Sequence, residues 1–147
     1  MRAFRFRLQR ILEFRHTRLA EEERKLKLLQ MELNAVAGQI EDVRRARRQS
    51  ASVLTSRDAL RGEDLRALAG FQARLRRGET VLQQKHAVCV RKLRLQEEAF
   101  KASRRDYRLL EELRKQRFAE WLQATNRELD QLASDLYLAR WDCKPRG

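Results

Sequence analysis

The chain has 147 residues, of which 37% are charged and 7% aromatic, with five glycines and one proline. Sheets need turns, and turns use clusters of glycine, proline, asparagine and aspartate that this sequence does not contain. A β-sandwich, a barrel and a doubly wound α/β fold are therefore excluded, and we predict an all-α chain of long helices. The net charge of +13 favours acidic partners but carries no information about the fold.

A seven-residue repeat organises the first third of the sequence. Steps of seven give one seam position, occupied by Leu12, Leu19, Leu26, Leu33, Ile40, Arg47 and Leu54. The second seam position holds Leu8, Arg15, Glu22, Leu29, Val36, Val43 and Ser50. A period of seven predicts that a helix over about residues 4–49 supercoils with a partner helix. Arg15 and Glu22 interrupt this seam, either as a polar layer that fixes the register or as a frayed, solvated stretch.

Residues 49–58 gather three serines and a threonine, whose side chains compete for the backbone hydrogen bonds of a helix. Gly62 follows, and Glu63 and Asp64 then place acid where the dipole of a new helix favours it. We therefore predict the turn of a hairpin over about residues 50–62.

A second helix is predicted over about residues 63–141, followed by a polar tail at 142–147. Its seam consists of Leu68, Leu75, Leu82, His86, Cys89, Leu93, Gln96, Phe100, Ser103, Tyr107 and Leu110. After Leu110 two successive steps of four residues, a stutter, shift the apolar positions of the heptad. From there the predicted seam consists of Phe118, Leu122, Thr125, Leu129, Leu132 and Leu136. Two long arms predict a single antiparallel coiled-coil hairpin over residues 1–147, in which residues 4–20 lie beside residues 120–140.

Groups that could carry catalysis do not converge in this sequence. His86 and Cys89 share the predicted seam, where a Cys–His pair or half of a metal site is the alternative to simple packing. No glycine-rich phosphate loop, nucleophile elbow or zinc-type spacing is present. We therefore predict a non-enzyme with no catalytic residue, no metal and no cofactor. Cys89 and Cys143 are widely separated, which favours reduced thiols in a cytosolic compartment.

Basic residues are unevenly spread, and they crowd residues 1–20, 44–48 and 72–94. Phosphate neutralisation makes a basic, nucleic-acid-binding coiled coil one alternative. A solvated helix face is the other, because the sequence lacks a helix-turn-helix, clustered stacking aromatics and a dimeric basic fork. A self-associating coiled-coil scaffold is a third hypothesis.

A late cluster of large side chains exceeds what one narrow seam can bury. Its members are Phe118, Trp121, Leu122, Tyr137 and Trp141. Tryptophan and arginine dominate the hot spots of protein–protein interfaces, so one interpretation is a binding surface. The other interpretation is packing against Phe4, Phe6 and Phe14 of the first helix. The two interpretations are compatible with each other.

The opening Phe4-Arg5-Phe6-Arg7-Leu8-Gln9-Arg10-Ile11-Leu12-Glu13-Phe14-Arg15 is similar to the start of flagellar export proteins of the FliJ family. The segment Leu110-Glu111-Glu112-Leu113-Arg114-Lys115-Gln116-Arg117 also fits that family. The resemblance implies a cytoplasmic two-helix protein of flagellum biogenesis and chemotaxis, peripheral at the inner membrane through the type III protein export apparatus. It would be the central stalk that binds and stimulates the hexameric flagellar export ATPase, and it would contact the membrane export gate protein and export chaperones. The related stalk of virulence-type secretion systems is the alternative.

Within this resemblance, contact sites for the partners can be predicted. The predicted pairing of the two ends of the hairpin and the charge gathered there lead us to expect that the ATPase contacts Arg5, Arg7, Arg10, Arg15, Arg114, Arg117, Trp121 and Arg127. Phe71 and Leu75 match an aromatic–aliphatic pair of the family and are expected to contact the export gate. Leu75 also falls on the heptad, so seam packing is the alternative for it, whereas Phe71 lies off that track. No small-molecule substrate and no nucleic acid are expected, and the free chain is expected to be monomeric.

Overall fold

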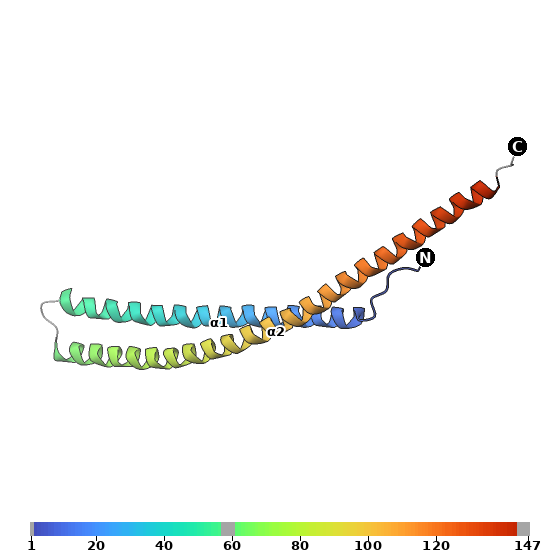
Figure 1. Ribbon diagram of the computed structural model, residues 1–147. Helices are drawn as coiled ribbons and strands as arrows, with labels where there is room; N and C mark the ends of the chain where they lie inside the picture. Colours follow the sequence, from blue (N-terminus) through green and yellow to red (C-terminus); the bar gives the residue numbers. More distant parts are fainter. Residues whose placement is uncertain (1, 57–60, 144–147) are drawn as a thin grey trace. The chain divides into compact units, whose positions relative to one another are not determined.

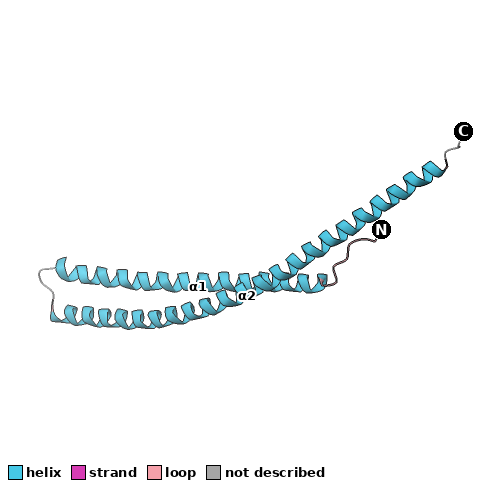
Figure 2. Ribbon diagram, viewed as in Figure 1, coloured by secondary structure: helices cyan, strands magenta, loops and turns pink. Residues whose placement is uncertain are grey.

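The computed structural model describes residues 2–56 and 61–143, and nearly all of them are helical (Figure 1, Figure 2). Helix α1 spans Gln9–Ser56 and helix α2 spans Gly62–Asp142. No strand occurs among these described residues, and the two long helices pack against each other. The predicted all-α fold class is therefore confirmed, and Glu63 and Asp64 do lie in the first turn of α2.

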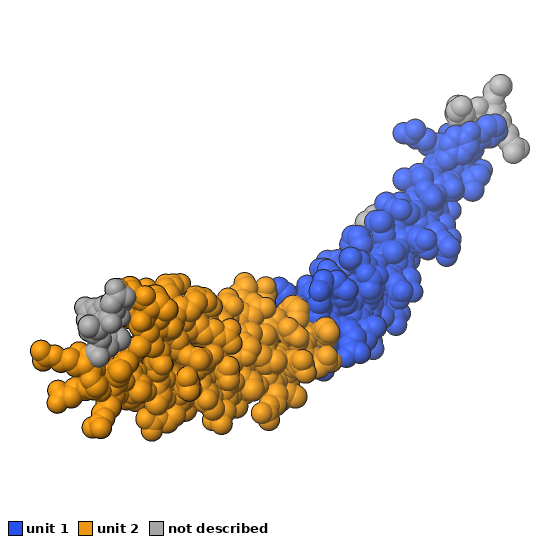
Figure 3. Space-filling model, turned by 90° about the vertical axis from the view of Figure 1, so that its left-hand side faces the viewer, with its two compact units in different colours: residues 1–19, 102–147 blue, residues 20–101 orange. Residues whose placement is uncertain are grey.

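The chain forms two compact units, which Figure 3 shows in different colours. Unit 1 consists of residues 1–19 and 102–147, and unit 2 consists of residues 20–101. Each unit contains one part of α1 and one part of α2, running antiparallel, where the sequence predicts a single hairpin unit.

The predicted heptad seam lies on the buried faces of the helices. Val36 and Ile40 are each 8% exposed and pack in unit 2 with Cys89, which is 4% exposed. The seam positions of α1 from residue 12 to residue 50, and those of α2 from residue 68 to residue 110, are all buried or half-buried. Among the predicted seam positions of α1, Leu54 alone is exposed, near the end of the helix. A repeat counted in the sequence therefore identifies the packed face.

Polar residues within the seam pair across it. In unit 2, Glu22 is buried, and the Gln96 side-chain amide donates to its carboxylate Oε2 and, over 3.1 Å, to its backbone carbonyl. In unit 1, Arg15 Nη1 donates to Asp106 Oδ2 over 3.1 Å. Buried polar groups that are satisfied in only one alignment favour one register. The Glu22–Gln96 pair therefore supports the polar-layer interpretation, and α1 is helical without a break at both positions, so it is not frayed there. The Arg15–Asp106 pair is solvated, with 36% and 48% of the two side chains exposed.

The predicted start of the first helix at residue 4 is wrong. Helix α1 begins at Gln9, whose N–H donates to the Phe6 carbonyl over 3.1 Å, and residues 2–6 are not helical. The reason is an alternation of apolar and basic side chains from Phe4 to Leu8, because a period of two is typical of extended chain.

The predicted turn at residues 50–62 is also wrong at both ends. Helix α1 continues to Ser56, and Gly62 already belongs to α2. Four hydroxyls near the end of α1 each donate to the carbonyl three residues earlier, over 2.7 to 3.3 Å: Ser50, Ser52, Thr55 and Ser56. These bonds satisfy the side chains within the helix, so they do not compete with it. Residues 57–60 of the predicted turn, and 144–147 of the predicted tail, lie outside the described residues.

The predicted alignment of residues 4–20 with residues 120–140 needs a correction within unit 1. Arg15 and His16 lie beside Asp106 and Tyr107, and the His16 and Tyr107 rings are 5.4 Å apart. Helix α2 has 81 residues and α1 only 48, so the arms are not of comparable length. As a result, every described side chain from residue 126 to residue 143 is exposed. The exposed side chains therefore include four leucines of the predicted late seam: Leu122, Leu129, Leu132 and Leu136.

Candidate functional site

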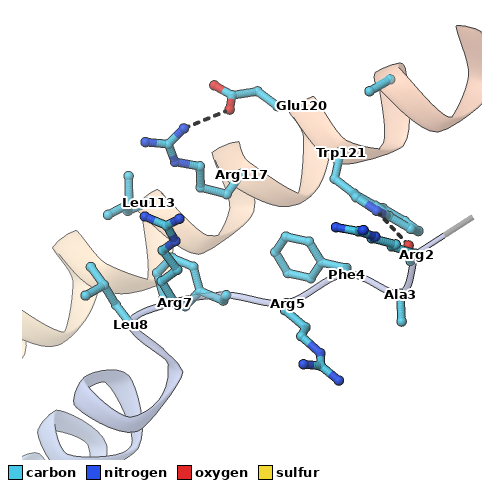
Figure 4. Close-up of a pocket in the computed structure, with 12 residues that line it drawn as sticks. Arg2, Ala3, Phe4, Arg5, Arg7, Leu8, Leu113, Arg117, Glu120 and Trp121 are labelled. Atoms are coloured by element: carbon cyan, nitrogen blue, oxygen red, sulfur yellow. Dashed lines mark hydrogen bonds and ion pairs between the residues drawn. The ribbon is translucent and has the colours of Figure 1, made fainter.

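The segment Arg2–Leu8, which we call the strap, lies along α2 in unit 1 (Figure 4). The Phe4 ring meets the Phe118 ring edge to face, with centroids 5.2 Å apart, and lies 5.9 Å from the Trp121 ring. The indole Nε1 of Trp121 donates to the Arg2 carbonyl over 3.2 Å. Aromatic pairs of this kind contribute about 0.5–1.5 kcal/mol beyond their buried area. Phe4 therefore fastens the strap to α2, whereas Phe14, also predicted to pack there, is 59% exposed.

Between the strap and α2 lies a groove of about 1170 Å³. It is lined by residues 2–8 of the strap and by Leu113, Arg117, Glu120, Trp121 and Ala124 of α2. Arg117 pairs with Glu120 over 3.3 Å, and Arg5 extends away from α2 (Figure 4). A groove that combines aromatic rings with several guanidinium groups has the composition of a protein-binding hot spot.

The groove contains half of the residues expected to bind the ATPase. Those that line it are Arg5, Arg7, Arg117 and Trp121. Those that do not line it are Arg10, Arg15, Arg114 and Arg127. Arg15 is occupied in its ion pair with Asp106, and Arg10, Arg114 and Arg127 are exposed on their helices.

Sequence reasoning missed several groove residues, namely Arg2, Leu113 and Glu120, whereas the predicted packing of Phe118 and Trp121 against Phe4 is confirmed. Phe4 was assigned to packing inside a helix, although the alternation Phe4-Arg5-Phe6-Arg7-Leu8 already carries the signal of an extended segment. An extended chain can lay its backbone along a helix, which is why the Arg2 carbonyl reaches Trp121.

The two residues expected to contact the export gate have different surroundings in unit 2. Leu75 is half-buried in the seam, which supports the packing interpretation for its side chain. Phe71 is 42% exposed and lies off the seam, as the heptad predicts. Of the two, Phe71 is the side chain accessible to a partner.

A second charged cluster surrounds Glu79 in unit 2. Glu79 is buried, and it accepts a hydrogen bond from Arg44 Nε over 3.0 Å and another from Arg47 Nη1 over 2.5 Å. The bond from Arg44, and then the bond from Arg47, hold the pKa of the Glu79 carboxyl below its usual range. Glu79 is thus an ionised acid enclosed by basic side chains.

The far part of α2 exposes a row of leucines, which we call the distal stripe: Leu122, Leu129, Leu132 and Leu136. Their exposed fractions run from 43% to 68%, and Tyr137 and Trp141 nearby are each 63% exposed. Contiguous exposed apolar surface of this kind is typical of interaction sites. The distal stripe is therefore a second candidate surface in unit 1.

The described parts of the chain contain neither a metal-binding cluster nor a helix that could span a membrane. No group of three or more histidine, cysteine, aspartate or glutamate side chains that could hold a metal occurs in residues 2–56 and 61–143. His86 is half-buried and Cys89 is buried in the seam. Neither described helix has an apolar stretch that could cross a bilayer.

No family model, no curated protein and no solved structure matches this chain.

Proposed function

We propose that this chain is a non-enzymatic stalk protein that binds and stimulates a hexameric export ATPase of the flagellar type III system. In the same proposal it links the ATPase to the membrane export gate and to export chaperones. The observation that carries the proposal is the groove in which Arg7, Arg117 and Trp121 lie together, with Arg5 as a further lining residue. The similarity of residues 4–15 to the start of FliJ-family proteins supports the same assignment.

The chemistry of the groove suits an acidic protein partner. Guanidinium groups at the edge of a groove attract carboxylates and speed their encounter, while aromatic rings supply most of the binding energy. The distal stripe offers further apolar surface on the same unit, so one partner could contact both. Phe71, exposed in unit 2, is the residue we assign to the export gate.

A virulence-type export stalk would use the same surfaces, and the identity of the cognate ATPase distinguishes the two systems. The first experiment is therefore ATP hydrolysis by a purified export ATPase, with and without this chain, at two salt concentrations. We expect stimulation that saturates near one chain per hexamer and weakens at high salt.

A matched pair of arginine variants tests the groove itself. Arg7 lines the groove, whereas Arg10 is exposed only three residues further along and does not line it. Arg7→Glu should weaken ATPase binding by about tenfold or more, which corresponds to ~1.4 kcal/mol. Arg10→Glu should have a clearly smaller effect. Equal effects of the two variants would mean that the overall positive charge, and not the groove, attracts the ATPase. Unchanged binding in both variants would contradict the assignment of the groove as the ATPase-binding site.

Nucleic-acid binding is the second candidate, and one observation favours it. All seven basic side chains between residues 72 and 94 of α2 form no ion pair with any other described residue: Arg74, Arg76, Arg77, Lys85, Arg91, Lys92 and Arg94. Such a surface can neutralise phosphates without reading sequence. Tight, salt-sensitive binding to duplex DNA, with no stimulation of the ATPase at either salt concentration, would favour this function over the stalk.

A further inference from the structure

A second groove, of about 430 Å³, lies between α1 and α2 in unit 2. Its walls are Arg44, Arg47, Arg48 and Ala51 from α1, and Gln72, Arg76 and Glu79 from α2. The spacing of the α1 residues places all four on one helix face, since neighbours on a helix surface lie three and four residues apart. The groove is thus lined by four arginines, Arg44, Arg47, Arg48 and Arg76, and by one carboxylate, that of Glu79.

Glu79 holds two of these arginines in place. Its buried carboxylate accepts one bond from Arg44 Nε and one from Arg47 Nη1, so each of its oxygens is engaged with a different guanidinium. The side chains of Arg44 and Arg47 nevertheless remain 49% and 38% exposed. Because a guanidinium carries five N–H donors, most donors of both arginines stay available to a ligand.

The other two arginines add charge that Glu79 does not neutralise. Arg48 pairs over 3.0 Å with Glu41, which does not line the groove. Arg76 forms no ion pair with any other described residue. One arginine, either Arg44 or Arg47, would be enough to neutralise the Glu79 carboxylate in the helix–helix seam. The groove lining therefore carries more positive charge than helix packing requires.

We propose that this groove binds a small phosphate-bearing polyanion, of the size and charge of a diphosphate or triphosphate group. All four basic residues are arginines, whose planar fork matches phosphate oxygens in pairs, and none is a lysine. Glu79 fixes two of them in advance, which lowers the entropy lost on binding. The site is separate from the strap groove and does not depend on the proposed stalk function.

Calorimetric titration of the full chain with sodium tripolyphosphate, at constant ionic strength, tests this proposal. Arg76→Gln removes a groove arginine without touching the bonds of Glu79, and it should weaken binding by about tenfold or more. Arg74→Gln removes an exposed arginine of the same helix that does not line the groove, and it should change affinity by less than about twofold. Helicity measured by circular dichroism should be unchanged in both variants, because both side chains are exposed.

The competing outcomes are distinct. Equal weakening by Arg76→Gln and Arg74→Gln would overturn the proposal, since the anion would then be held by surface charge alone. Displacement by equimolar sulfate at the same ionic strength would also overturn it. If one-site binding depends on Arg76, parallel titrations with a nucleoside triphosphate and with inositol trisphosphate identify whether a nucleotide, a lipid headgroup or a free phosphate chain is the preferred source.

Discussion

Two stretches of α2 follow a period of seven residues, yet their surroundings differ. From Leu68 to Leu110 the seam positions are buried or half-buried against α1, whereas the leucines of the distal stripe are 43% to 68% exposed. The exposed stretch is the more apolar of the two, because the paired seam includes Gln96 and Ser103. A heptad thus identifies a helix face that requires a partner, but the length of the partner helix decides where that partner is present in the chain.

The difference has a functional consequence for the distal stripe. Polar positions in a seam weaken it and fix its register, while leucines supply affinity with less selectivity. A stripe of leucines without cover in the described chain is the composition of a surface that a partner protein buries. We therefore place the apolar part of the proposed partner contact on the distal stripe and its charged part on the strap groove.

Alanine substitutions of one aliphatic residue in the seam between α1 and α2 and of one in the distal stripe should separate the two surroundings most strongly. Ile40 is 8% exposed in the paired seam, and Ile40→Ala should lower the free energy of unfolding by about 2–4 kcal/mol. Leu132 is 55% exposed, and Leu132→Ala should change that free energy by less than about 0.5 kcal/mol. Urea unfolding followed by circular dichroism measures both.

A large loss of stability for Leu132→Ala in the isolated chain would break this comparison, because it would mean that the distal stripe is already covered. If the loss grew with protein concentration, the cover would be a second copy of the chain, as the scaffold hypothesis predicts.

The polar layer at Glu22 offers the next largest effect. Glu22→Leu alone leaves the half-buried Gln96 amide without its carboxylate partner and should cost about 1–2 kcal/mol. Adding Gln96→Leu should recover that loss, since replacing both buried partners by apolar groups is nearly neutral or stabilising. A double-mutant cycle from urea unfolding gives the coupling between the two residues. Simple additivity of the two substitutions would contradict the pairing across the seam.

Glu79 should make the paired region sensitive to acid. Because hydrogen bonds from Arg44 and then Arg47 lower its pKa, folding favours the ionised form. The stabilisation is complete above the ordinary pKa of glutamate, about 4.3, and is lost as the pH falls through the lowered value. Glu79→Gln should thus reduce the melting temperature at pH 7 but have progressively less effect below pH of about 4. Glu98→Gln, on an exposed face of α2, is the control and should shift the melting temperature little at either pH.

The sequence predicted the fold class and the seam because both depend on local spacing. Leu12, Val36, Ile40 and Cys89 were all assigned to the seam, and all are buried. The candidate site was predicted only in part, because the strap joins residues that lie far apart in the chain, such as Arg2 and Trp121. The end of α1 was missed for a different reason, since a serine hydroxyl can compete with a helix or bond within it, as Ser52 does.

The smallest effect concerns the strap, and a matched pair of phenylalanines measures it. Phe4 contacts Phe118 and Trp121, whereas Phe14 is 59% exposed on α1. Phe4→Ala should cost about 1 kcal/mol and should shift the Trp121 emission to longer wavelength as water reaches the indole. Phe14→Ala should leave that emission unchanged.

A Trp141→Phe background isolates the signal, since the chain has two tryptophans. If the strap is part of the proposed partner surface, Phe4→Ala should also weaken ATPase binding while the paired seam stays intact, as judged by unchanged helicity. A normal Trp121 spectrum in Phe4→Ala would mean that the strap does not cover α2 in solution. In that case the strap groove would not be formed in the free protein. The distal stripe alone would remain as the candidate partner surface of unit 1.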